Sequence, residues 1–336
     1  PARIHYTDIG DYLTREDKLA KTQAAQRITG LEPVIQITPN TPGDWLNQRR
    51  DDFGSFIAVG AKDGEPAIFH LYSGGLKTNR DAWCYNFSTT TLTNSMRLLI
   101  DTYENDRKCG RTSLTATTDP HKISWNRGLL SDLDRQRTRA FDQRASRLAT
   151  YRPFTRENVY FERALNDMVY RLEDLFPSRD LRTKGFYCLN PGADKPFSTL
   201  TVADLPDLAF YGSNAGQFFA RWRYEKVEAE DGMLSLDTAY DDDAEVIDGY
   251  RRIDNITDHA LTTFRAAYGD RITKDDIFFY VYGLLHSPDY RETYAADLKK
   301  MLPRIPLVTD PWPYVEAGRR LSELHLGYES VDPYPL

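Results

Sequence analysis

The stretch RQRTRAFDQRASRLATYRPFTRENVYF, residues 135–161, is the part of this sequence from which the rest is best interpreted. Between positions 135 and 156 it holds seven arginines and one acid, Asp142, in a chain whose net charge is −7. The arginines are Arg135, Arg137, Arg139, Arg144, Arg147, Arg152 and Arg156. Guanidinium groups match the geometry of phosphate, and bases can stack on nearby aromatic rings such as those of Tyr151, Phe154, Tyr160 and Phe161.

Two interpretations of this stretch stay open at the level of sequence. It is either a surface that contacts phosphate, or a solvated helix that leads into a turn at Pro153 with its aromatic residues in the core, because runs of like charge usually face water. In both cases we expect helix from Trp125 onward, ending before Pro153, since a residue that precedes proline disfavours the helical conformation.

Charge is distributed unevenly along the chain. Residues 225–248 contain ten acids and only Lys226 as a base, so the remaining 312 residues carry a net charge of +2. An acidic total therefore does not exclude a nucleic-acid partner, whose phosphates need basic contacts. We expect residues 225–254 to be an acidic surface insertion. Its Asp241, Asp242 and Asp243 lack the spacing of a calcium loop, so no metal site is predicted.

A second basic segment follows a predicted β-hairpin. Two strand-like runs, Phe53–Ala61 and Ala67–Tyr72, flank an Asp-Gly pair that suits a turn. We expect residues 73–81 to be a flexible polar loop in which glycines permit close approach to a ligand. Its candidate contacts to phosphate or base edges are Lys77, Thr78, Asn79 and Arg80. The alternative is a tight turn held by an ion pair between Arg80 and Asp81.

The remaining pattern predicts a mixed α+β fold, in which β-hairpin and sheet elements with helices precede a helical C-terminal subdomain. Apolar spacing indicates helices at residues 91–106 and 158–176, and β-rich runs indicate strands at 185–189, 197–202, 208–211 and 216–224. Arg221 and Arg223 lie on one side of the last strand, either toward a ligand or outward from a sheet edge. Helix-cap signals stand at Asn255, Thr273, Ser287-Pro288 and Asp310-Pro311, and Gly327 ends the last helix.

Catalytic and cofactor motifs are missing from the sequence. It contains no GxxxxGK[ST] nucleotide loop, and neither the Phe-x-Gly-x-Gly nor the Asn-Pro-Pro-aromatic motif of adenine methyltransferases. Cys84, Cys109 and Cys188 are far apart, and no apolar run reaches the roughly 18 residues of a membrane helix. We therefore expect a cytoplasmic protein with no catalytic residue, metal or cofactor of its own.

Several blocks carry a resemblance to a known family. TYRPFTRENVYFERALN (150–166) resembles the Tyr-Arg-Pro-Phe block in the C-terminal target-recognition region of type ISP restriction-modification enzymes. Further blocks are similar in the same order. They are IHYTDIGDYLTREDKL (4–19), DWLNQR (44–49), GLKTNRDAWCYNFS (75–88), ISWNRGL (123–129) and DIFFYVYGLLHSPDYRETYAADLKKMLPRIP (276–306). The resemblance covers nearly the whole chain, apart from the acidic stretch after Tyr224.

This resemblance implies a function and a domain organisation. Enzymes of the family join a nuclease, a helicase-like ATPase, an adenine-N6 methyltransferase and a specificity domain, and use S-adenosylmethionine, ATP and Mg²⁺. The chain would be the module that recognises double-stranded DNA, with those other domains of one polypeptide as partners. Residues 1–22 would be the linker from the methyltransferase, 23–224 the recognition domain and 255–336 the helical subdomain. The alternative is a module that couples domains and has little affinity for DNA.

Overall fold

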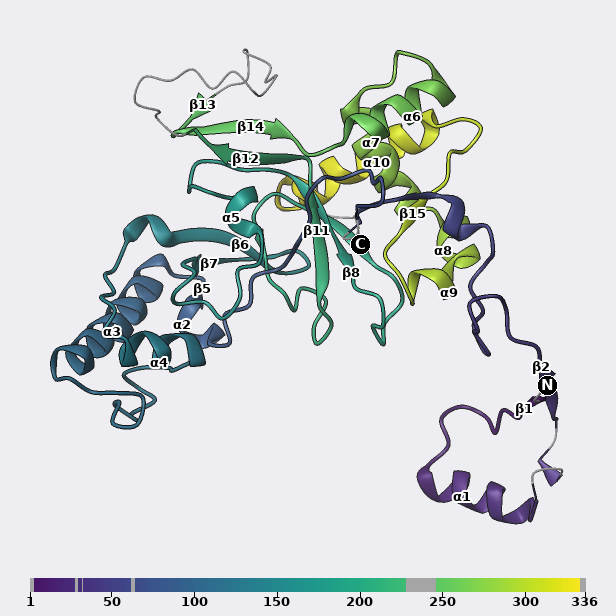
Figure 1. The fold of residues 1–336 in the computed structure, drawn as a ribbon, viewed down its shortest axis with the longest axis horizontal. Helices are drawn as coiled ribbons and strands as arrows, with labels where there is room; N and C mark the ends of the chain where they lie inside the picture. Colours follow the sequence, from purple (N-terminus) through teal and green to yellow (C-terminus); the bar gives the residue numbers. More distant parts are fainter. Residues whose placement is uncertain (1–2, 28–29, 32, 62–63, 228–245, 333–336) are drawn as a thin grey trace. The chain divides into compact units, whose positions relative to one another are not determined.

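The computed structural model describes all residues except 1–2, 28–29, 32, 62–63, 228–245 and 333–336 (Figure 1). Its contacts divide the chain into two units, Pro1–Ser55 and Phe56–Leu336. In the first unit, β1 (Ile4–Tyr6) pairs antiparallel with β2 (Ile35–Ile37), and a capping box of Thr14 and Asp17 starts α1 (Arg15–Ala24). A 3-10 turn, η2 (Phe53–Ser55), ends this unit. No residue of α1 is buried, so helix-cap bonds rather than packing hold it.

One lobe of the second unit combines a four-stranded sheet with the helices α2, α3 and α4, at the left of Figure 1. The strand order is β10-β6-β7-β5, in which β10 runs parallel to β6 and the other pairs are antiparallel. Leu92, Met96, Leu99 and Tyr103 form the buried face of the long helix and pack in one core with Leu129 and Leu133. The elements are α2 (Asp81–Cys84), β5 (Tyr85–Asn86), α3 (Thr89–Lys108), α4 (Arg127–Asp134), η3 (Gln143–Ala145), β6 (Ser146–Arg152), β7 (Thr155–Tyr160) and β10 (Leu205–Pro206).

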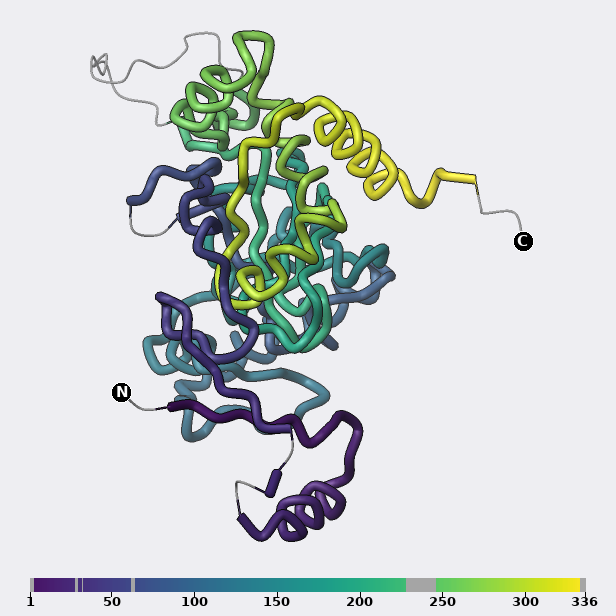
Figure 2. The backbone as a smooth tube through the Cα atoms, turned by 90° about the vertical axis from the view of Figure 1, so that its right-hand side faces the viewer, coloured from purple at the N-terminus to yellow at the C-terminus, as the bar shows by residue number. Residues whose placement is uncertain are grey.

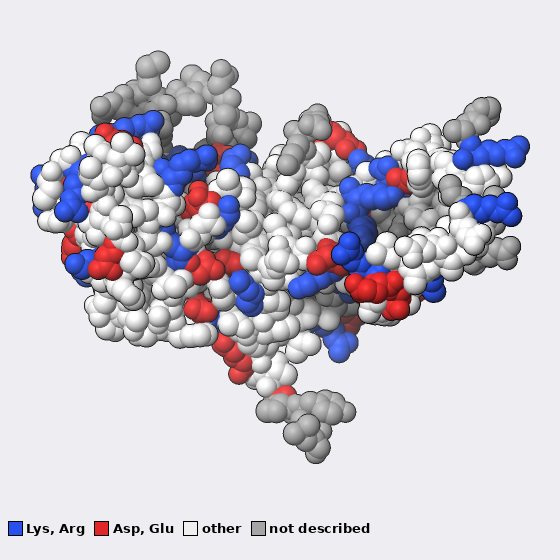
Figure 3. All heavy atoms as spheres, turned by 90° about the horizontal axis from the view of Figure 1, so that it is seen from below, with Lys and Arg blue, Asp and Glu red and all other residues white. Residues whose placement is uncertain are grey.

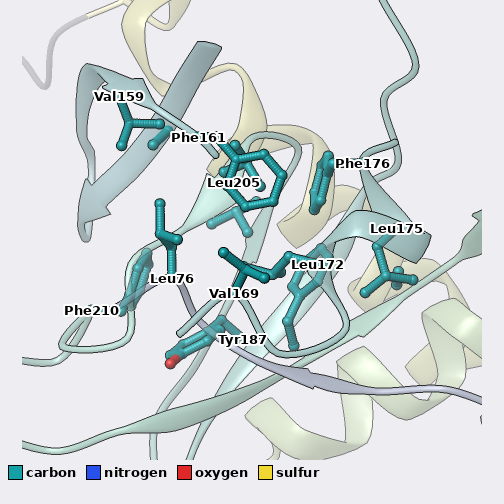
Figure 4. Close-up of a cluster of buried hydrophobic side chains, with 14 of the residues drawn as sticks. Leu76, Val159, Phe161, Val169, Leu172, Leu175, Phe176, Tyr187, Leu205 and Phe210 are labelled. Atoms are coloured by element: carbon teal, nitrogen blue, oxygen red, sulfur yellow. The ribbon is translucent and has the colours of Figure 1, made fainter. Parts of the chain in front are cut away.

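A second four-stranded sheet lies at the centre of this unit. Its order is β4-β11-β8-β9, all antiparallel, and every residue of β8 and β9 is buried. Figure 4 shows the buried side chains that join the two sheets, among them Leu76, Leu172, Phe176, Tyr187 and Phe210. The elements are β4 (Ser73–Gly74), α5 (Leu172–Leu175), β8 (Gly185–Leu189), β9 (Thr199–Val202) and β11 (Gly216–Ala220).

Two smaller sheets and a set of helices complete the second unit. The order β12-β14-β13 is antiparallel, and β15 pairs with β3. Helices α7 and α10 make the most extensive helix contact, and Figure 2 shows α10 in yellow near the end of the chain. The elements are β3 (Ile57–Ala58), β12 (Trp222–Lys226), β13 (Val246–Ile247), β14 (Tyr250–Asp254), α6 (Asp258–Tyr268), α7 (Lys274–His286), α8 (Pro288–Thr293), α9 (Ala295–Leu298), β15 (Arg304–Ile305), α10 (Trp312–Leu326) and η4 (Tyr328–Ser330).

The α+β class and most helices are confirmed. Helix α3 covers the predicted 91–106, and the Thr273 and Ser287 caps are both present, with Pro288 at the first helical position. Of the one or two helices predicted between Trp125 and Pro153, α4 (Arg127–Asp134) is present, but the prediction of helix through the rest of the arginine stretch is wrong. After α4 ends at Asp134, the chain forms the antiparallel hairpin β6–β7, with Pro153 and Phe154 in its turn. Cross-strand pairing of Thr- and Tyr-rich segments outweighs local helix propensity here.

Four other local predictions are also wrong. Residues 158–176 contain the end of β7 and the short α5, not one long helix. The two runs at 53–72 form no hairpin, because β3 pairs with β15 and Ala58 meets Ala67 in an isolated parallel bridge. No strand forms at 208–211. The predicted strand 216–224 is two strands in different sheets, β11 and β12, with Arg221 between them.

The acidic segment falls mainly outside the described residues, since 228–245 are not among them. Its flanks form β12 before the gap and β13 and β14 after it. The domain boundaries proposed from sequence stay predictions. Within the described part of the chain, no helix combines the length and apolar character needed to cross a membrane.

Candidate nucleic-acid interface

A groove of about 1210 Å³ lies between two parts of the second unit. On one side are α4 and the segment that follows it, and on the other is the strand pair β12–β14. We call this groove the arginine groove. Seven basic side chains line it: Arg127, Arg135, Arg137, Arg139, Arg147, Arg163 and Lys226. Six acids also line it: Asp132, Glu162, Asp167, Glu173, Asp174 and Glu225. Four arginines of the predicted stretch therefore share one concave surface, although they lie on no common helix.

Asp132 is the acid that organises two of these arginines. It is 7% exposed, accepts a hydrogen bond from Arg137 Nη1 at 3.1 Å, and also pairs with Arg139 Nη2. Asp132 lies in the last turn of α4, so the carboxylate holds the chain that leaves the helix. Both guanidinium groups keep spare N–H donors after these bonds, because each has five. Asp132 therefore fixes the positions of both guanidinium groups and leaves some of their N–H donors available to a ligand.

Arg147 has a mainly structural role at the floor of the groove. Its Nη1 donates to the carbonyl oxygens of Phe176 and Ser178, the latter at 3.3 Å, and its guanidinium lies 4.9 Å from the centre of the Phe161 ring. Burial lowers the pKa of Arg147. These bonds tie β6 to the segment after α5, so the side chain offers little to a ligand.

Arg127, Arg135 and Lys226 are the groove's exposed cations without an ion pair among the described residues. Arg163, in contrast, pairs with Glu173 at 2.5 Å. The sequence interpretation missed Arg127, Arg163 and Lys226. Arg127 and Arg163 could have been noticed, since they lie in the ISWNRGL and TYRPFTRENVYFERALN blocks, but nothing local marks Lys226 as a neighbour of the arginine stretch.

Arg152 and Arg156 do not line the arginine groove. Arg152 Nη1 lies 2.7 Å from Asp207 Oδ1, and Arg156 pairs with Asp204 at 3.2 Å and Glu329 at 3.0 Å. Both aspartates are buried. Between them Phe154, at a φ of +57°, packs edge-on against Tyr328. The hairpin turn is thus bound to the C-terminal segment.

Arg144 is a highly exposed member of the stretch. Its side chain is 87% exposed and forms an ion pair at 3.1 Å with Asp142, which also caps η3. The hydrogen bond from Arg144 lowers the pKa of Asp142. Arg144 lines a second groove of about 1080 Å³ that shares Arg147 and Tyr250 with the arginine groove.

Most residues of the segment 73–81 are buried, so the prediction of a flexible loop is wrong. β4 pairs with β11, and Lys77 and Met168 exchange both backbone hydrogen bonds at 2.9 Å. Gly75 has no room for a side chain, because a Cβ would lie 2.7 Å from Leu208 N, next to the Asp207 carbonyl. The glycine therefore serves close packing of two backbones, and not approach to a ligand.

The four candidate side chains in this segment differ in how far they are buried. Lys77 Nζ is 3.0 Å from Asp167, a groove residue, and its side chain is 36% exposed. Asn79 is exposed at a φ of +53°, whereas Thr78 is buried and bonds to Asp81. Arg80 is 4% exposed. The alternative of an Arg80–Asp81 ion pair is wrong, because Asp81 bonds to Thr78 and to the Tyr151 hydroxyl at 3.0 Å.

Arg221 and Arg223 also have partners within the chain. Arg221 is 3% exposed and bridges Asp254 and Asp275. Arg223 pairs with Glu225. Arg221 therefore joins β14 to the start of α7. Whether any candidate of this or the preceding segment contacts DNA stays a prediction.

Basic and acidic side chains alternate over the lobe that contains α3 and α4. On the face shown at the left of Figure 3, blue and red atoms are interspersed. Acids near an arginine compete with phosphate for it, so this lobe's basic residues do not form an uninterrupted phosphate track on that face.

A family model described as the Type ISP C-terminal specificity domain matches residues 67–336. The chain belongs to this family. The resemblance inferred from sequence blocks is thereby confirmed. A comparison of this chain with curated proteins found no match.

Solved structures similar to this specificity domain include three larger proteins. One is the "ATP-dependent Type ISP restriction-modification enzyme LlaBIII bound to DNA", with 32% identity and a TM-score of 0.83 over 99% of this chain. A second is a nuclease-deletion mutant of LlaGI in complex with a DNA substrate mimic, with 32% identity and a TM-score of 0.80 over 99%. A third is the DrdV–DNA complex, with 29% identity and a TM-score of 0.79 over 99%. The specificity domain spans 20%, 29% and 31% of those chains, respectively.

Proposed function

We propose that this chain recognises a sequence in double-stranded DNA and holds the duplex for other domains of a type ISP restriction-modification enzyme. Those domains would methylate adenine at N6 and cleave DNA with ATP, and would bind S-adenosylmethionine, ATP and Mg²⁺. The partners of this chain would be the methyltransferase and the helicase-like ATPase domains of the same polypeptide. The enzyme would act in the cytoplasm.

The observation that carries this proposal is similarity over 99% of the chain to enzymes whose structures contain DNA or a DNA mimic. The arginine groove adds a physical reason, since it collects Arg127, Arg135 and Lys226, which form no ion pair with any described residue, beside the positioned Arg137 and Arg139. Phosphate contacts position a duplex, while base contacts specify its sequence. The alternative, a module that couples domains and has little affinity for DNA, is less favoured, because that role does not require a groove lined by basic side chains.

A titration of labelled duplex with the purified chain tests the proposal directly. We expect binding at 50 mM salt that weakens steeply as salt rises, because each neutralised phosphate adds about 0.9 to the slope of log affinity against log salt. If duplex does not bind even at low salt, the coupling module becomes the better description.

The groove itself is tested by a double variant, Arg127→Ala with Arg135→Ala. We expect it to weaken all duplexes about equally and to reduce the salt slope by about 1 to 2, because two phosphate contacts are removed. A matched control is Arg320→Ala with Lys299→Ala, which removes two exposed cations that do not line the groove. Equal slopes for the two double variants would assign the phosphate contacts to another surface.

A further inference from the structure

A pocket of about 520 Å³ lies next to the arginine groove, and the segment 167–174 contributes side chains to both. Tyr170 and Arg171 line the pocket, whereas Asp167, Glu173 and Asp174 line the groove. We call it the tyrosine pocket. Arg171 Nε pairs with Asp174 Oδ2, so the rim of the pocket meets the rim of the groove. A ligand that lies along the groove is therefore close to this pocket.

Tyr170 has an unusual backbone conformation at the pocket. Its φ is +46°, which is strained for a bulky aromatic residue, and its side chain is 41% exposed. The ring lies against Gly74, where a Cβ would come within 3.0 Å of two ring carbons. Strained residues that the surrounding fold holds in place are common at binding sites. The fold thus keeps an exposed aromatic ring at the pocket in spite of the strain.

The other side chains of the tyrosine pocket suit an uncharged, polar ligand. Asn190 and Gln217 line it, and their side-chain amides make no hydrogen bond with any described residue. Besides tyrosines, the titratable side chains that line it are His70 and Arg171. Burial lowers the pKa of His70, so this imidazole is neutral near pH 7, and Arg171 is paired with Asp174. No free cation is left for phosphate among the described residues of the pocket.

A nucleobase has the properties that these side chains would recognise. It is planar and uncharged, and it stacks on aromatic rings. Its edge carries donors and acceptors that match the amides of asparagine and glutamine. Enzymes that modify a base in DNA take it out of the helix, which leaves the opposite base unpaired. The proposed function therefore supplies unpaired bases close to this pocket.

We propose that the tyrosine pocket binds a base that has left the helix of the bound duplex. The base lies against the ring of Tyr170, and its edge faces the amides of Asn190 and Gln217. This inference rests on the proposed function, and it adds a base-binding site to the surface that holds phosphates. The contact is uncharged, so it adds affinity without adding to the salt slope.

Three labelled duplexes test the pocket with the full chain. One is fully paired, one carries a single bulged nucleotide, and one carries a bulged nucleotide that lacks its base. Both bulges interrupt the helix, so a difference between them reports the base itself. We expect wild type to bind the bulged base on the order of tenfold more tightly than the abasic bulge, as for one base stacked on an aromatic side chain.

Variants assign this preference to the pocket. Tyr170→Asn removes the ring, and asparagine tolerates a positive φ. It is expected to abolish the preference for the bulged base and to leave the salt slope for paired duplex unchanged. Gln217→Leu removes an amide at similar size and should reduce the preference. Tyr12→Asn is the matched control, because Tyr12 is exposed at a φ of +59° but does not line the pocket, and it should keep the preference.

A fluorescent adenine analogue in the bulge gives a second readout. Its emission is expected to be quenched by stacking in wild type and not in Tyr170→Asn, whose thermal midpoint reports whether it is folded. Equal binding of the two bulges by wild type, or a preference that survives in both Tyr170→Asn and Gln217→Leu, would overturn the pocket and leave DNA recognition intact. If wild type does not bind paired duplex even at low salt, the proposed function fails, and this inference fails with it.

Discussion

Gly318→Ala is expected to lower the free energy of unfolding by about 3 kcal/mol or more, the range of severe overpacking. Gly318 in α10 faces Gly283 in α7, and the helices touch there through their backbones. A Cβ on Gly318 would overlap the Phe279 carbonyl oxygen and lie 2.8 Å from Gly283 N. The obstacle is backbone on both sides, so no flexible side chain can yield.

Chemical denaturation of the whole chain measures this effect. Gly128→Ala is the matched control, because its Cβ would come no closer than 3.5 Å to the Asn126 side chain and the residue lies in a helix. That change is expected to be neutral or to stabilise by up to about 1 kcal/mol, since alanine favours helix over glycine. A Gly318→Ala protein as stable as wild type would show that α7 and α10 do not pack at this distance.

Arg152→Met is expected to lower the free energy of unfolding by about 2 to 3 kcal/mol at pH 8. Removing one partner of a buried pair costs about 3 to 5 kcal/mol, and we discount this figure because the Arg152 side chain is 32% exposed. Asp207, 3% exposed, would keep the Tyr85 hydroxyl at 3.1 Å and Ala209 N at 2.9 Å as donors. The Asp207 carboxylate would, however, lose its ion pair with the Arg152 guanidinium.

The loss is expected to depend on pH in a defined direction. Burial raises the pKa of Asp207 from 3.8 to about 6, although Arg152 opposes this shift. The folded protein therefore holds this proton more tightly than the unfolded chain, and the carboxyl's contribution to stability decreases as pH rises from about 4 to 6. Without Arg152 the folded pKa rises further. The difference between Arg152→Met and wild type should then grow above about pH 6 and vanish below about pH 5.

Denaturation curves at pH 5 and pH 8 check this prediction. Asp207→Asn in the Arg152→Met background should recover most of the loss at pH 8, because no buried charge is left unpaired. Arg144→Met is the matched control, because its ion pair with Asp142 is exposed to solvent and is expected to contribute little to stability. A salt slope for duplex binding reduced by Arg152→Met would instead favour the phosphate contact suggested by the sequence.

The elements that the sequence predicted correctly depend on nearby residues. Helix α3 follows from the spacing of Leu92, Met96, Leu99 and Tyr103, and α7 is capped by Thr273, whose hydroxyl accepts from Asp276 N three residues later. Such signals involve residues within one or two helical turns of one another, so they can be identified from the sequence alone. Family membership was also readable, because the resembling blocks are long and occur in order along nearly the whole chain.

The candidate site depended on contacts that no local pattern shows. Arg152 meets Asp207, 55 residues away, and Arg156 meets Glu329, 173 residues away, so seven arginines that look alike in sequence have different roles. The hairpin β6–β7 likewise forms because β10 and β5 flank it, which local helix propensity cannot foresee. Local patterns and family blocks were enough to predict the α+β class, the capped helices and the family. Which cations face the groove depends instead on the folded chain, because burial and distant carboxylates set the environment of each guanidinium.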